Sequence, residues 1–186
     1  VPDRIECNCK IFADDTNIYD TTDNKDKLHR DLDRLIDWSN TWNLYFNASK
    51  CKVVHYGNKN PNYSYNIKND SESVTLEKSE EEKDLGVTFD YRLKFDRHIN
   101  DAIAKANKML GIIKRPFTYR DKDTLTRLYK TLVRPHLEYG NTIWHPLLKR
   151  QSISIEKVQR RATRLIEGIR HLSYEDRLRI LYICHP

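Results

Sequence analysis

The spacing of apolar residues changes near the middle of the chain, and this change does most to limit the folds open to it. Before residue 96, short runs alternate polar and apolar side chains on either side of one helical segment, which is typical of strands around a helix. From residue 96 onward, apolar residues recur every three or four positions, which predicts amphipathic helices. We therefore expect an α+β region over 1–95 and an all-α region over 96–186.

The first region opens on a predicted β-hairpin. Residues 5–13 alternate, Asp14 and Asp15 break the run, and TNIYDT resumes it, so the two carboxylates lie at the hairpin tip. A helix is predicted from about Asn24 to Asn43. Its expected buried stripe is Leu28, Leu32, Leu35, Ile36 and Trp42, and its expected exposed face is Arg30, Asp31, Asp33, Arg34 and Asp37. Residues 44–56 are predicted to form an extended run, a turn at Asn-Ala-Ser and then a strand, and further short strands are predicted over 63–67, 73–76 and 84–90.

The second region is predicted to hold four helices. They cover 96–115, the surroundings of 125–132, 155–169 and a segment that includes Leu178 and Leu181. Pro116 should end the first helix, and Pro135 should interrupt the second, because proline lacks the N–H that a helix interior requires.

Composition excludes several classes of protein. Aromatic residues make up 10% of the 186 positions, which is unlike a wholly disordered chain despite a mean hydropathy of −0.80. No apolar run approaches the roughly 20 residues that span a bilayer, and the opening residues lack the apolar core of a signal peptide. We therefore expect an intracellular chain that is not secreted and has no membrane partner.

The remaining chemistry-bearing residues have ordinary structural interpretations. Four cysteines without a CxxC pair predict free thiols rather than a disulfide framework, with Cys7 and Cys9 as core or half-buried side chains. Core anchors are expected at Trp38, Trp42 and Trp144, and helix-surface or capping residues at His98 and His136. Asn47 is expected to shape a turn before the next strand.

Charge is divided unevenly along the chain. The net charge is +6, but residues 1–93 carry −5 and residues 94–186 carry +11. A basic surface attracts polyanions, so the second half is predicted to bind nucleic acid through its phosphates. The candidate contacts are Lys105, Lys108, Lys114, Arg115, Lys157, Arg160, Arg161 and Arg164. The last four follow helical spacing and share one face, and a face that is merely solubilising is the alternative.

The pair Asp14-Asp15 is the feature with most chemical content. Polymerases that join nucleotides hold two divalent ions between carboxylates, and hard Mg²⁺ prefers carboxylate oxygens. Two adjacent aspartates in a turn are also common solvated turn formers, so the pair alone does not decide between the two readings.

The surrounding sequence favours the polymerase reading. FADDTNIY, followed by the leucine-rich helix, Trp38, Trp42 and NASKCKVV, closely resembles the reverse transcriptases of non-LTR retrotransposons, especially jockey-like elements. Asp84-Leu85-Gly86-Val87 resembles the primer-grip hairpin of that family. VRPHLEYGNTIWHP and IEKVQRRATRLI resemble its helical region after the palm. The resemblance implies that 1–95 is the C-terminal part of a polymerase palm and 96–186 a thumb-like helical region.

The resemblance also implies roles for single residues. Asp14 would bind metal, with Asp15 as its neighbour closer to the primer end, and Phe12 stands where the family more often has Tyr. Lys50 would lie near the triphosphate, although a solvated lysine is an equal reading. Leu85, Gly86 and Val87 would form the primer grip, where a glycine lets backbone approach the primer, although an ordinary glycine in a β-bulge is an equal reading of Gly86.

The implied reaction is DNA synthesis on an RNA template with two Mg²⁺ ions, a DNA primer and deoxynucleoside triphosphates. We expect the chain to be a fragment that needs the rest of the polymerase, because another carboxylate and a nucleotide-binding segment would precede Asp14. The fragment alone is expected to be inactive, and the location nuclear and cytoplasmic. One alternative is a non-catalytic nucleic-acid-binding module derived from a retrotransposon. A metal hydrolase using the aspartate pair ranks last, since no histidine or third carboxylate accompanies it in a motif.

Overall fold

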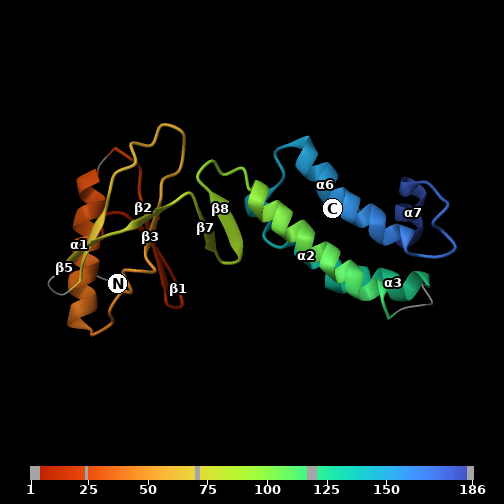
Figure 1. Cartoon of the computed structure of the whole chain (residues 1–186), viewed down its shortest axis with the longest axis horizontal. Helices are drawn as coiled ribbons and strands as arrows, with labels where there is room; N and C mark the ends of the chain where they lie inside the picture. The colour runs from red at the N-terminus through yellow and green to blue at the C-terminus, as the bar shows by residue number, and fades with distance from the viewer. Residues whose placement is uncertain (1–4, 24, 70–71, 117–120, 184–186) are drawn as a thin grey trace. The chain divides into compact units, whose positions relative to one another are not determined.

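The computed structural model describes residues 5–23, 25–69, 72–116 and 121–183 (Figure 1). The chain divides into two compact units, residues 1–82 and residues 83–186, and each is described by itself below. The mixed α and β composition predicted from the sequence is confirmed.

The first unit begins with the predicted hairpin. Strands β1 (Asn8–Phe12) and β2 (Asp15–Tyr19) pair antiparallel, with Phe12 opposite Asp15 and Asn8 opposite Tyr19. Helix α1 (Lys25–Thr41) follows, as its leucine spacing predicts.

Two small sheets complete the first unit. Strand β3 (Lys52–Val54) pairs parallel with β6 (Glu77–Ser79), and β4 (Asn66–Asn69) pairs antiparallel with β5 (Glu72–Thr75). Helix α1 packs beside β4, and its apolar stripe covers a small core. The buried members of that core are Ile36, Tyr65, Ile67 and Leu76.

The end of α1 corrects one prediction. Trp42 was expected in the buried stripe, but its side chain is 65% exposed. Asn43 adopts a left-handed φ of 54°, and the N–H of Leu44 returns to the carbonyl of Ser39, which closes the helix. The chain therefore leaves the helical path one residue after Trp42, and this indole never reaches the core.

The strand predicted over 84–90 is right only from Val87, because the segment turns at Leu85 and Gly86, as the resemblance to a primer-grip hairpin implied. Strand β7 (Glu81–Asp84) and strand β8 (Val87–Asp90) form a two-stranded sheet joined by Leu85 and Gly86. Both joining residues have positive φ, 44° and 85°, as a two-residue hairpin turn requires. A run of alternating residues hid this turn, since Leu is a poor predictor of left-handed backbone.

Helices make up the rest of the second unit. Helix α2 (Asp96–Lys114) is followed by α3 (Lys122–Leu128), a π-helical turn (Tyr129–Val133), α4 (Arg134–Glu138) and the short α5 (Asn141–Trp144). Helix α6 (Lys149–Arg164) runs alongside α2 in Figure 1, and α7 (Tyr174–Leu181) packs on α6. The core contains Ile99, Leu110, Val133, Trp144, Val158 and Leu178 among others.

The regular α-helix is interrupted next to Pro135, as predicted, but the helical path does not end there. The π-helical turn of Tyr129–Val133 precedes it, and the helical conformation continues to Glu138. A π turn is one residue wider than an α turn, so it absorbs the carbonyl that the proline ring would otherwise strike. Trp144, 2% exposed, confirms its expected role as a core anchor. Within the described residues, every helix is too short or too polar to cross a bilayer.

Candidate functional site

The two aspartates lie where the hairpin reverses direction. Because Phe12 pairs with Asp15, only Ala13 and Asp14 connect the strands, and Ala13 has a left-handed φ of 53°. Both carboxylates are exposed, and neither forms an ion pair with any side chain in the described part of the molecule. Paired, accessible oxygen donors of this kind suit Mg²⁺, which keeps several of its waters.

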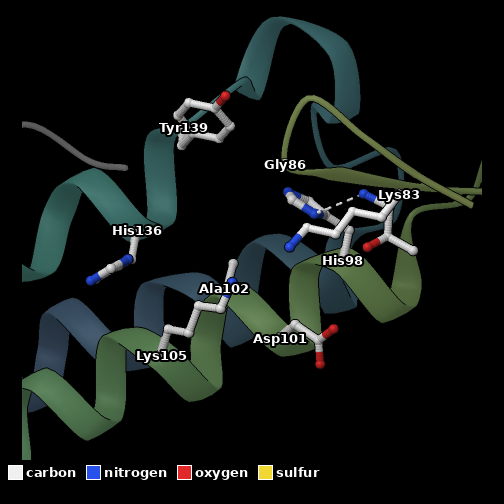
Figure 2. Close-up of a pocket in the computed structure, with 9 residues that line it drawn as sticks. Lys83, Gly86, His98, Asp101, Ala102, Lys105, His136 and Tyr139 are labelled. Atoms are coloured by element: carbon white, nitrogen blue, oxygen red, sulfur yellow. Dashed lines mark hydrogen bonds between the residues drawn. The ribbon is translucent and has the colours of Figure 1, made fainter. Parts of the chain in front are cut away.

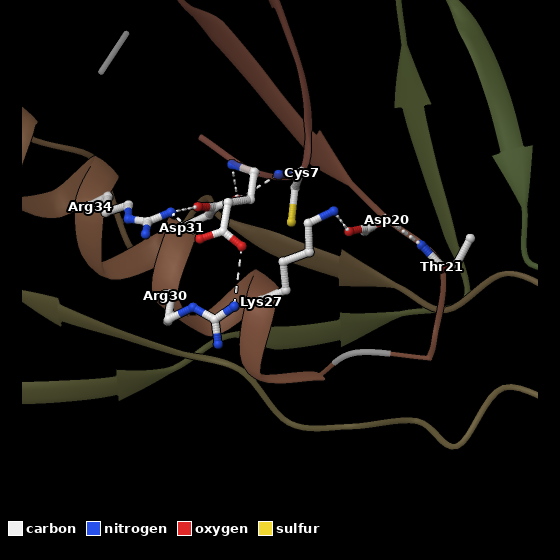
Figure 3. Close-up of polar contacts among 8 residues, drawn as sticks. Cys7, Asp20, Thr21, Lys27, Arg30, Asp31 and Arg34 are labelled. Atoms are coloured by element: carbon white, nitrogen blue, oxygen red, sulfur yellow. Dashed lines mark hydrogen bonds and ion pairs between the residues drawn. The ribbon is translucent and has the colours of Figure 1, made fainter. Parts of the chain in front are cut away.

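Helix α1 holds the start of this hairpin through a buried carboxylate (Figure 3). Asp31 is fully buried, and its Oδ2 accepts hydrogen bonds from the backbone N–H groups of Glu6 (2.9 Å) and Cys7 (2.6 Å). The Nη1 of Arg34 donates to Oδ1 at 2.8 Å. The sequence placed Asp31 on the exposed face of α1, and that prediction is wrong.

Ion pairs extend this contact to both ends of the hairpin. Ahead of β1, the carboxylate of Glu6 pairs with Arg34 at 2.8 Å and with Arg30 at 3.2 Å. After β2, Asp20 pairs with Lys27 of α1 at 2.5 Å (Figure 3). Helix α1 therefore binds the chain both just before β1 and just after β2. These contacts limit how far the hairpin, with Asp14 at its tip, can move.

The acid–base properties of these groups follow from their neighbours. Burial alone raises the pKa of Asp31, but the N–H donors of Cys7 and Glu6 and the Arg34 guanidinium outweigh it and hold the pKa below its ordinary value. Burial, with help from Asp31 and Asp20, raises the pKa of the Cys7 thiol to about 12. Cys7 therefore stays a protonated, unreactive thiol, which agrees with the predicted structural role.

Lys50 lies in a turn rather than on a strand. Asn47 builds that turn: its carbonyl accepts from the N–H of Lys50 at 2.9 Å, and its side chain accepts from Ser49, as predicted. The Lys50 side chain is exposed and forms no ion pair with a described carboxylate. The structure thus leaves its approach to a triphosphate as a prediction.

The Leu85–Gly86 turn of the second unit is packed closely against one tyrosine. The Tyr139 hydroxyl donates to the carbonyl of Leu85 at 2.8 Å. A Cβ built on Gly86 would lie 3.1 Å from Cε1 of the same ring. The glycine is therefore required here by the left-handed turn and by the tyrosine ring.

A polar cavity of about 140 Å³ lies beside this turn (Figure 2). Helices α2 and α4 and strand β8 line it together with the turn. The lining side chains with ionisable groups are Lys83, His98, Asp101, Lys105, His136 and Tyr139. Two lysines, Lys83 and Lys105, thus surround the cavity with a single carboxylate, that of Asp101, which favours an anionic occupant.

His98 corrects a further prediction, since it was expected on a helix surface. Its ring is 8% exposed, its Nδ1 accepts the N–H of Thr88 at 3.3 Å, and its centroid is 5.2 Å from that of Trp144. Burial lowers the pKa of His98, Lys105 and Lys83 lower it further, and Asp101 opposes them. The imidazole is thus held neutral, with its proton on the other nitrogen.

The basic residues predicted to contact phosphate are all on the surface. On α6, Lys157, Arg160, Arg161 and Arg164 are exposed, while Ile155, Val158 and Ala162 on the other side are buried. On α2 and at its end, Lys105, Lys108, Lys114 and Arg115 are exposed as well. Arg160 also has contacts within the protein. It forms an ion pair with Glu156 at 3.7 Å, and its guanidinium lies 4.4 Å from the Tyr174 ring centroid.

The aspartate pair at the hairpin tip offers two exposed carboxylates to a metal ion. Over the described ranges, no three His, Cys, Asp or Glu side chains gather closely enough to hold a metal ion. The pair therefore fits part of an oxygen-donor site for Mg²⁺.

Sequence reasoning missed three residues that shape these features. Asp31 and His98 had signals that were available: each lies three or four positions from buried apolar residues of its own helix, such as Leu35 and Ala102. Tyr139 had no such signal, because its partners lie 54 positions away in the chain.

Comparison with known proteins identifies similar chains. The chain is 26% identical over 167 residues to the RNA-directed DNA polymerase from mobile element jockey of Drosophila melanogaster, covering 84% of this chain. It is 28% identical over 142 residues, 73% of this chain, to the probable RNA-directed DNA polymerase from transposon X-element of the same species. The jockey polymerase of Drosophila funebris is 27% identical over 166 residues, 85% of this chain.

These matches cover only a small part of each relative. The chain spans 18%, 15% and 17% of the three polymerases. No protein-family model matches it, and no solved structure matches it. Over most of its own length the chain is similar to RNA-directed DNA polymerases of mobile elements, which confirms the resemblance to the non-LTR reverse transcriptases.

Proposed function

We propose that this chain is one segment of an RNA-directed DNA polymerase of a non-LTR retrotransposon. One combination of observations carries the proposal. An exposed aspartate pair sits at the tip of a hairpin that α1 braces at both ends, in a chain similar over 84% of its length to the jockey polymerase. The first unit would contribute to the palm and the helices of the second to the thumb.

The proposed role of the aspartate pair follows from its oxygen donors. Asp14 and Asp15 would hold Mg²⁺, with the remaining carboxylates supplied by other parts of the polymerase. When bound, a pair of such ions activates the primer 3′-hydroxyl and neutralises charge on the triphosphate and the departing pyrophosphate. Asp14, in the connection itself, would be the main ligand, and Asp15 its neighbour toward the primer. Lys50 would add positive charge near the triphosphate.

The second unit would hold the primer–template. The exposed row Lys157, Arg160, Arg161 and Arg164 offers regularly spaced cations to a sugar–phosphate backbone, and such contacts carry no base information. The Leu85–Gly86 turn would lie against the primer strand as a primer grip, with Val87 buried beneath it. RNA template, DNA primer and deoxynucleoside triphosphate are the partners that this reading requires.

The basic face of α6 also favours a second candidate function. A module that binds nucleic acid without chemistry would use the same exposed cations and would need neither aspartate. The two candidates differ in whether the aspartate pair matters to any activity.

The proposal is tested by assaying the polymerase that contains this segment. Purified enzyme is supplied with an RNA template, a DNA primer, the four deoxynucleoside triphosphates and Mg²⁺. We expect primer extension that depends on the template sequence and stops when the ion is chelated. Binding of the primer–template without any extension would contradict the polymerase assignment and support the non-catalytic module.

A further inference from the structure

We propose that Tyr139 is a positioning residue that fixes the Leu85–Gly86 turn against the end of a primer strand. The inference rests on the proposed function, in which this turn acts as the primer grip. It goes further because it names the side chain that sets the conformation of the turn.

Tyr139 contacts the turn through both its hydroxyl and its ring. The hydroxyl donates to the Leu85 carbonyl at 2.8 Å, and the ring lies 3.1 Å from where a Cβ on Gly86 would be. Leu85 and Gly86 both have positive φ, so the turn needs an outside contact to favour this conformation over others. The tyrosine supplies that contact.

The backbone of Tyr139 is fixed in turn by the core. Its carbonyl accepts the Nε1–H of Trp144 at 2.7 Å, and Trp144 is 2% exposed. The next residue, Gly140, has a φ of 67°, and a Cβ there would lie 3.1 Å from Cγ2 of the buried Val87. The segment after α4 therefore packs against β8 at a distance that only glycine permits.

His98 of α2 contacts the backbone of β8 one residue after Val87. Its Nδ1 accepts the N–H of Thr88 at 3.3 Å while its ring packs on Trp144. Three contacts therefore hold the turn and the start of β8. Tyr139 binds Leu85, Gly140 lies against Val87, and His98 of α2 binds Thr88. The turn is itself at the surface, but the residues that contact it are tied to the buried Trp144 and Val87.

The exposure of Tyr139 separates this role from ordinary packing. Its side chain is 59% exposed, so the residue contributes little to the core, and its hydroxyl bond lies at the surface. The Tyr139 ring lies at the surface beside Gly86, which has no side chain. It is therefore suited to keep the turn in one conformation against which a nucleic-acid strand can bind.

The experiment uses the chain of 186 residues and a primer–template whose primer ends in a photoreactive nucleotide. Tyr139→Phe removes only the hydroxyl, and Tyr182→Phe removes one from another exposed tyrosine of the same unit. Crosslinked residues are mapped by mass spectrometry, and affinity is measured separately by anisotropy.

We expect crosslinks at residues 85–87 in the wild type. In Tyr139→Phe their yield should fall roughly fivefold, as loss of one hydrogen bond loosens the turn, while affinity stays within about twofold. Amide hydrogen exchange at Gly86 and Val87 should accelerate by a similar factor, and Tyr182→Phe should change neither quantity.

Unchanged crosslinks and unchanged exchange in Tyr139→Phe would overturn the proposal. So would crosslinks that avoid residues 85–87 in the wild type. If Tyr139→Phe loses the far-ultraviolet circular dichroism of the wild type, the comparison is made with Tyr139→Leu, provided that its helix content equals that of the wild type. Failure here leaves the polymerase assignment standing, because that assignment is tested by Asp14 in an extension assay, where Tyr139 is unaltered.

Discussion

At the scale of single residues, Asp31 shows how a buried charged side chain can stabilise a fold. It lies between Leu28 and Leu35 at helical spacing, so its position on α1 faces the interior. Its charge is acceptable there because backbone N–H groups from outside the helix and Arg34 satisfy it. The sequence shows the spacing but not the donors, which come from residues 24 and 25 positions away.

Changing this carboxylate should loosen the first unit. We expect Asp31→Asn to lower the free energy of unfolding by about 3 kcal/mol, because Arg34 and the backbone N–H groups of Glu6 and Cys7 lose their charged acceptor. Asp33→Asn on the same helix, at an exposed position, should change it by less than about 0.5 kcal/mol. Hydrogen exchange of the α1 amides measures both, and equal protection in the two variants would contradict the buried role.

His98 should make the second unit sensitive to acid. Its folded pKa lies below the ordinary value of 6.5, so between the two values the unfolded chain binds more protons than the folded one. Its contribution to stability is therefore complete above about pH 6.5 and is lost as the pH falls toward the folded pKa.

This loss is measured by urea unfolding of the second unit between about pH 7 and pH 5. His98→Gln keeps an acceptor for Thr88 but does not titrate, so its stability should change less across this window. His136→Gln, at another wall of the cavity, should retain the wild-type decrease. A decrease of the same size in His98→Gln would show that other groups cause it.

At the scale of elements, periodicity predicted the long helices well and the turns poorly. Helices α1, α2 and α6 carry long apolar stripes. The bounds of α1 and α2 were predicted within two residues, whereas α6 begins six residues before and ends five residues before the predicted range of 155–169. Periodicity missed the Leu85–Gly86 turn, which only the resemblance to a primer-grip hairpin implied, and it missed the π-helical turn before Pro135. Both depend on backbone conformations that packing stabilises and that no local residue pattern specifies.

The exposed face of α6 makes a prediction about salt. If it follows a duplex backbone, affinity should fall with salt with a log–log slope of about −0.9 per phosphate contact. Changing Arg160, Arg161 and Arg164 to Gln should flatten that slope by roughly two to three units and leave sequence discrimination unchanged.

A salt titration of primer–template binding measures both slopes. The matched control changes Lys59, Lys68 and Lys78 to Gln, which removes the same charge from exposed positions of the first unit. Equal slopes in the two triple variants would mean that the α6 face is only solvated.

At the scale of the whole chain, the α+β character and the position of the aspartate pair followed from the sequence. The division into units at 82/83 did not, because strand β8 packs on α2 through Val87 and Phe89, side chains that alternation assigned only to a strand. The palm and thumb assignment remains a proposal, supported by similarity to jockey and X-element polymerases.

The central claim is that the hairpin carries the metal ligands of a DNA polymerase. The direct measurement is primer extension by the polymerase that contains this segment, with Asp14→Asn, Asp15→Asn and, as a control, Asp23→Asn at an exposed position after the hairpin. We predict that Asp14→Asn abolishes extension because a charged metal ligand is lost, that Asp15→Asn lowers it less, and that Asp23→Asn leaves it unchanged. Extension by Asp14→Asn within about tenfold of the wild type would contradict the account.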